Sequence, residues 1–185
     1  MSDWRTLAIS KRIPGWGQIL PVYAVIVLML YSWTTLSLFW LVPSWLYFMH
    51  PGEILQVFAY GCATNLVESL AVLCALVIPS LVLPGKWFHD RFVARGSALA
   101  MSGLGYMMFV AFQYTSKADY PRFALNARSL ALAVAFILLL VFLAGRIDSL
   151  RKGIEFFADQ ATVFLYVSIP LSVVALVGIL IRLAI

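Results

Sequence analysis

Three side chains that could carry chemistry, Thr64, Asn65 and Glu68, lie inside a long apolar stretch of the sequence. Glu68 is the only Asp, Glu, Lys or Arg residue between Ile54 and Gly85. A charge at the centre of a bilayer costs at least about 2.5–3.5 kcal/mol, so such a carboxyl group is protonated, paired or in contact with water. We therefore take these three residues as a candidate proton- or cation-handling site, or as a polar contact between helices.

Helical spacing predicts the direction in which Glu68 points. A set of mostly small or polar residues recurs along one helical face at steps of three or four: Gly61, Thr64, Asn65, Glu68, Val72 and Ala75. Such a face lets a neighbouring helix approach closely and supply hydrogen bonds. We expect Glu68 to face protein and to be neutral, with possible partners at Ser32, Thr34, Thr35, Ser37, Ser102, Tyr106, Tyr166, Ser168 and Ser172.

The composition identifies the elements that must position these residues as membrane helices. The chain has 185 residues, of which 63% are hydrophobic and 11% charged, whereas soluble domains are about 25% charged. A crossing needs about 20 mostly apolar residues. This predicts an all-α bundle of five transmembrane helices in a single domain, at about 19–42, 54–80, 97–115, 128–145 and 161–182. We expect Pro79 and Pro84 to end the second helix and Pro170 to kink the fifth.

The basic residues predict the orientation, because Lys and Arg gather on the cytoplasmic side of membrane proteins. Nine belong to the N-terminal segment and to the second and fourth connections: Arg5, Lys11, Arg12, Lys86, Arg91, Arg95, Arg146, Arg151 and Lys152. The opposite side has four, which are Lys117, Arg122, Arg128 and Arg182. We therefore expect the N-terminus inside and the C-terminus outside.

Two segments have the pattern of interfacial helices, at about 2–12 and 146–159. In the second, Ile147, Leu150, Ile154 and Phe157 recur at helical spacing, and we expect ion pairs between Asp148 and Lys152 and between Arg151 and Glu155. The basic residues Arg91, Arg95, Arg151 and Lys152 are expected to contact anionic lipid headgroups on the cytoplasmic face, or a partner protein.

Three functions are compatible with this sequence. The chain lacks the phosphate-binding, zinc-protease and serine-hydrolase motifs, which favours a non-catalytic subunit or scaffold of a larger membrane complex. The alternative is a small carrier or channel component that moves protons or a small solute, with Glu68 as the titrating group. Partners would be the bilayer, other membrane subunits or further copies of the chain, and no nucleic acid.

The third function is the membrane part of a system that handles lipids or envelope polymers. In helix count and direction alone, the chain resembles the membrane portion of lipoteichoic-acid synthases and phosphoethanolamine transferases, and no catalytic motif is shared. No spacing indicates a metal, and no motif identifies a cofactor. Tyr31, Trp33, Tyr60 and Tyr106 could line a quinone or pigment site but are more simply explained by packing. A haem held by one histidine and a methionine such as Met49, Met107 or Met108 is a further alternative without a positive signal. Compactness and the absence of targeting signals favour a prokaryotic inner membrane.

Overall fold

A computed structural model describes residues 15–82, 91–116 and 126–184 of the chain. The regular structure in these ranges consists of five helices, which are α2 (Trp16–Trp45), α3 (Pro51–Val82), α5 (Phe92–Ser116), α7 (Ala127–Arg146) and α8 (Asp148–Ala184). Each of them contains one of the five predicted spans. The chain is therefore an all-helical, multi-pass membrane protein.

Four of these helices are long and apolar enough to cross a bilayer, namely α2, α3, α7 and α8. The other, α5, has 25 residues and is about 37 Å long at 1.5 Å per residue, which is also sufficient for a crossing. Its apolar sequence is interrupted by small and polar residues such as Ser102, Gly103, Gly105 and Gln113. The length of α5 thus fits a fifth crossing, whereas its composition is less apolar than that of the other four.

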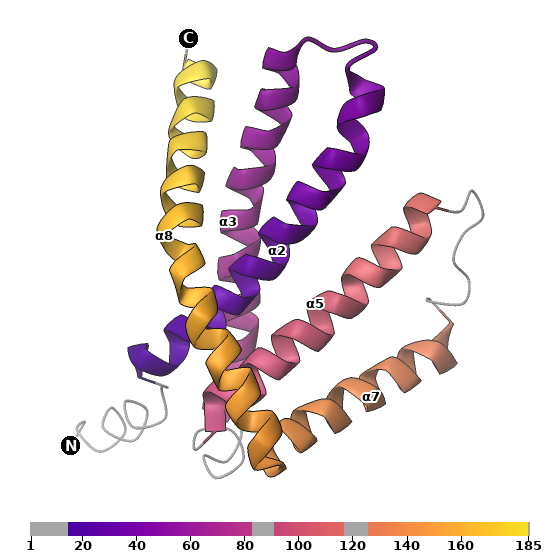
Figure 1. Ribbon diagram of the computed structural model, residues 1–185, viewed down its shortest axis with the longest axis vertical. Helices are drawn as coiled ribbons and strands as arrows, with labels where there is room; N and C mark the ends of the chain where they lie inside the picture. The colour runs from indigo at the N-terminus through magenta and orange to yellow at the C-terminus, as the bar shows by residue number, and fades with distance from the viewer. Residues whose placement is uncertain (1–14, 83–90, 117–125, 185) are drawn as a thin grey trace, which may run out of the picture.

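Helix α2 is the centre of the packing. Its buried residues include Val22, the run from Ala24 to Val27, and Tyr31, and helices α3, α5 and α8 all pack against it. Figure 1 shows α8 and α3 beside α2, with α5 running obliquely along α2 and α7 diverging on the far side of α5. The core therefore lies where the first half of α2 meets its three neighbours.

Helix α7 contacts α5 and α8 but contributes little to the core. Apart from Ala144 and Gly145 near its end, its side chains are exposed or half-buried, and many of the exposed ones are large and apolar. In a bilayer these side chains face lipid, which is as apolar as they are.

Both ends of helix α3 differ from the predicted boundaries. Helix α3 begins with Pro51, whose missing N–H costs nothing at the first helical position, and the His50 N–H donates to the Glu53 carboxylate over 2.8 Å. It continues past Pro79 and ends at Val82, so the prediction that Pro79 ends it was wrong. Pro84 lies outside the described residues.

Helix α8 differs most from the expected segments. Residues 148–184 form one helix that contains Pro170, so the amphipathic segment predicted at 146–159 is continuous with the span that follows it. The helix bends along its length (Figure 1). The other predicted interfacial helix, at 2–12, lies outside the described residues.

Candidate functional site

A pair of hydrogen bonds joins α2 to α3 near the middle of both helices. The Asn65 amide donates to the Thr34 hydroxyl over 2.9 Å, and the Thr34 hydroxyl donates to the Asn65 carbonyl oxygen over 3.0 Å. Asn65 is only 4% exposed. Asn65 was predicted as a polar contact between helices, and in the structure its side chain forms both of these hydrogen bonds with Thr34 of α2.

A second group of hydrogen bonds joins α2 to both α3 and α8. The Tyr31 hydroxyl lies 3.2 Å from the Cys62 carbonyl oxygen and within hydrogen-bond distance of the Ser172 hydroxyl, and it can donate its single proton to either of them. Ser172 donates in turn to the Ser168 carbonyl oxygen of its own helix over 2.7 Å. Two turns closer to the start of α2, the Tyr23 hydroxyl lies 3.2 Å from the Ser69 hydroxyl.

These contacts involve only hydroxyl and amide groups among the described residues, so they connect helices without a carboxylate or a basic side chain. Tyr23 and Ser69 were not predicted as members of this cluster, and Tyr31 was predicted only as a residue that could line a cofactor site. Residue spacing could have indicated which face of α3 is buried. Cys62, Asn65, Ser69 and Leu76 recur at steps of three, four and seven residues, and all four are buried.

Glu68 lies outside this cluster. Its side chain is exposed, and no hydrogen bond or ion pair to it is found within the described part of the chain. The expectation that Glu68 faces protein was therefore wrong for a single chain. At 3.6 residues per turn, Ser69 lies about 40° around the helix from Asn65, and Glu68 lies about 60° from Asn65 in the opposite direction. Ser69 faces α2, so Glu68 is turned away from it.

The exposed side of α3 carries its own set of small and polar residues. Thr64 is exposed, and its hydroxyl donates to the Tyr60 carbonyl oxygen one turn earlier over 2.9 Å. Ala71 and Ala75 follow Glu68 at helical spacing and are also exposed. We call Tyr60, Thr64, Glu68, Ala71 and Ala75 the outer face of α3. The sequence predicted Thr64, Asn65 and Glu68 on one helical face. In the structure, Asn65 lies on the side of α3 that faces α2, whereas Thr64 and Glu68 lie on the outer face.

The predicted basic residues gather at another place, where α5 and α8 begin and α7 ends. Arg95 lies against Gly145, because a Cβ atom built on that glycine would overlap the guanidinium group of the arginine. Arg151 lies 3.6 Å from the Asp148 carboxylate and 3.8 Å from that of Glu155. The predicted pair of Arg151 with Glu155 is confirmed, whereas Asp148 pairs with Arg151 instead of Lys152.

The remaining two basic residues lie on the same segments. Arg91 directly precedes α5 and is half-buried, and Lys152 is exposed on the first turns of α8. Within residues 15–82, 91–116 and 126–184, no three His, Cys, Asp or Glu side chains lie together as a metal site would require. No family model, curated protein or solved structure matches this chain in the three comparisons with known proteins. Its own residues are therefore the basis for a functional proposal.

Proposed function

We propose that this protein is a non-catalytic subunit of a larger membrane assembly and that the outer face of α3 is its contact with a helix of another subunit. The exposed position of Glu68 is the observation that carries this proposal. It lies near the middle of the 32-residue helix α3 and has no hydrogen-bond partner among the described residues. Intramembrane carboxyl groups are costly, and they rarely face lipid.

The residues around Glu68 suit a neighbouring helix. Ala71 and Ala75 present no side chain beyond a methyl group, so a second backbone can approach the helix closely there. A hydroxyl, amide or basic side chain on that helix, at the depth of Glu68, would supply the missing hydrogen bond. Contacts of this kind have been worth about 1–2 kcal/mol in model peptides.

The position of Glu68 favours a subunit over the carrier considered from the sequence. A titrating carboxyl group in a carrier faces a wet cavity or the interior of the bundle. Glu68 is not among the residues that line three surface cavities between the described helices. None of these three cavities therefore gives Glu68 the surroundings that proton or ion transfer requires.

We further propose a prokaryotic inner membrane with the N-terminus on the cytoplasmic side. The distribution of nine basic residues against four supports this orientation. With this orientation, the ends of α5, α7 and α8 that carry Arg95, Arg146 and Arg151 would lie at the cytoplasmic surface.

Native mass spectrometry of the tagged protein, extracted from its own membrane in mild detergent, tests the proposal. We expect stoichiometric foreign membrane subunits. A homo-oligomer would instead identify the partner helix as α3 of a second copy. A bare monomer would contradict the subunit function, and proton flux measured in liposomes would then test the carrier.

Two variants connect this measurement to the outer face of α3. Glu68→Leu removes the carboxyl group, and Ala71→Trp blocks close approach, so each should weaken partner association by about five- to thirtyfold. Cys74→Trp is the matched control, because Cys74 is exposed on the same helix but about 120° around it from Glu68.

Glu68→Gln keeps a hydrogen-bonding group and should insert and assemble normally. Its failure to insert would indicate that a charged carboxylate is needed.

A further inference from the structure

Unpartnered buried polar atoms gather at one end of the molecule. Among the described residues, four buried side-chain atoms lack a hydrogen-bond partner, namely Gln18 Oε1, Arg95 Nε, Ser97 Oγ and Arg151 Nε. All four lie within the first turns of α2, α5 and α8. The start of α5 is close to the other two, because Gly96 lies against Val22 of α2 and Arg95 lies against Gly145, three residues before α8 begins. Buried polar groups normally have hydrogen-bond partners, so these atoms indicate a partner group that the described residues do not supply.

The missing group is expected to be an anion. Among the described residues at this end, five cations (Arg91, Arg95, Arg146, Arg151 and Lys152) outnumber three carboxylates (Asp148, Glu155 and Asp159). Both ion pairs of Arg151 are longer than a hydrogen bond, so its guanidinium is only partly neutralised. Arginine guanidinium groups match the geometry of phosphate oxygens.

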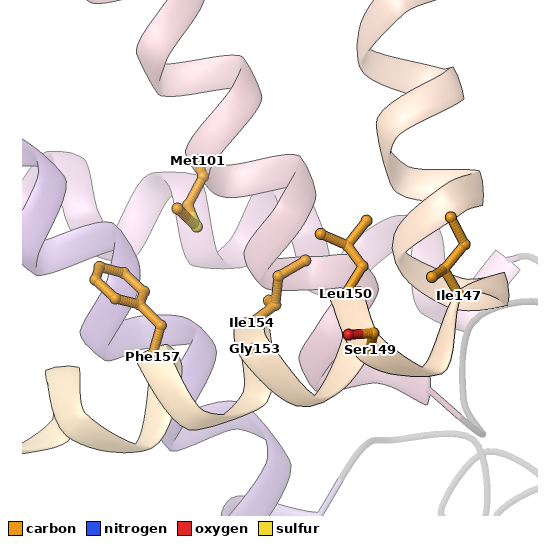
Figure 2. A pocket seen from close by; sticks show the side chains of 7 residues that line it. All are labelled: Met101, Ile147, Ser149, Leu150, Gly153, Ile154 and Phe157. Atoms are coloured by element: carbon orange, nitrogen blue, oxygen red, sulfur yellow. The ribbon is translucent and has the colours of Figure 1, made fainter.

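An apolar groove of about 490 Å³ begins beside these cations. Figure 2 shows Leu150, Ile154 and Phe157 rising from α8 toward Met101, which comes from α5. The groove runs from Ile147 to Phe157, ten residues and therefore about 15 Å along α8, which is half the thickness of the hydrocarbon core of a bilayer. Its polar end is close to Arg95, because Arg95 lies against Gly145, only two residues before Ile147.

We propose that this end of the molecule is a binding site for an anionic phospholipid, whose phosphate binds Arg95 and Arg151 and whose acyl chain lies in the groove from Ile147 to Phe157. A bilayer provides both parts of this ligand in one molecule. The site does not involve the outer face of α3, so it stands independently of the subunit function.

Native mass spectrometry of the full-length protein tests this site with defined lipids added. We expect dioleoyl phosphatidylglycerol to remain bound to the wild type at concentrations where dioleoyl phosphatidylcholine does not. Arg95→Gln and Arg151→Gln should each weaken phosphatidylglycerol binding about fivefold, which corresponds to ~1 kcal/mol per basic residue near a membrane surface. Arg128→Gln is the matched control, because Arg128 is exposed at the opposite end of α7.

Two glycine variants test the geometry without removing a charge. Gly145→Ala places a methyl group where the Arg95 guanidinium now lies, so it should weaken lipid binding, whereas Gly178→Ala meets open space and should not. Gly153→Leu should fill the groove and lower retention of the acyl chain, since a Cβ atom at Gly153 also meets open space.

Three results would overturn the proposal. If Arg128→Gln weakens binding as much as Arg95→Gln, the lipid is held by overall surface charge. If the protein retains both lipids equally, no anionic site exists. If inorganic phosphate displaces phosphatidylglycerol at equal concentration, the site recognises a soluble anion and the groove contributes nothing. Should Arg95→Gln fail to fold, Arg151→Gln and Gly145→Ala provide the same comparison.

Discussion

At the scale of single residues, the described polar side chains at mid-membrane depth fall into two groups with different consequences. Thr34 and Asn65 satisfy each other, and Tyr31 satisfies groups on two neighbouring helices. Glu68 is the exception, because its carboxyl group is exposed and finds no partner within the described ranges. We therefore expect substitutions in the first group to change the stability of the chain, and substitutions of Glu68 to change its assembly.

The pair of Thr34 and Asn65 allows a quantitative test at this scale. Thr34→Val and Asn65→Leu each remove one partner at similar volume, and their double mutant removes both. Coupling energies of such pairs average about 0.6 kcal/mol and reach about 1.7 kcal/mol in a membrane protein, and the closed geometry here predicts a value in the upper half of that range. The measurement is reversible unfolding in mixed micelles of detergent and SDS, and a coupling of zero would show that the two side chains do not bind each other.

At the scale of helices, the sequence predicted where each element lies better than how it is rotated. Runs of apolar residues determine a span directly, so all five predicted spans fall inside observed helices. The rotation of α3 depended on choosing between Glu68 and Ser69, which are adjacent and both polar. The side of α3 that faces α2 is identified by two contacts from α2: Tyr23 reaches Ser69, and Tyr31 reaches the Cys62 carbonyl group. These contacts join residues more than 30 positions apart, and no pattern within α3 reports them.

The close approach of α2 and α5 gives a prediction at the same scale. A Cβ atom at Gly96 would lie 3.2 Å and 3.3 Å from the two methyl carbons of Val22, a fully buried side chain with one preferred rotamer. Gly96→Leu should therefore destabilise the protein by about 1–3 kcal/mol through overpacking. Gly103→Leu on the same helix is the control, because a Cβ atom there meets no atom within 4 Å. Equal midpoints for the two variants in thermal unfolding in detergent would contradict the packing of α2 on α5.

At the scale of the whole molecule, α2 holds the bundle together and α7 lies outside it. Hydrogen bonds join α2, α3 and α8 near the middle of these helices, and Arg182 also donates to Gln56 where α8 ends and α3 begins. Helix α5 runs obliquely along α2, and the rings of Trp40 and Phe112 stack near the ends of these two helices with 5.6 Å between centroids, whereas α7 diverges (Figure 1). The starts of α5 and α8 lie together at the end that carries the proposed lipid site, and the C-terminus lies at the other (Figure 1).

The orientation of this arrangement in the membrane gives the last prediction. Ser149 lies at the basic end, at the start of α8, and Asn126 directly precedes α7 at its opposite end; both are exposed. In a background without Cys62 and Cys74, single cysteines at these two positions should react differently with an impermeant maleimide in intact cells. The excess of basic residues near Ser149 predicts that only the cysteine at position 126 is labelled, and that permeabilisation exposes both. The reverse pattern would mean that the four basic residues of the opposite side outweigh the nine near Ser149 and the N-terminus, and the proposed lipid site would then face the outer leaflet.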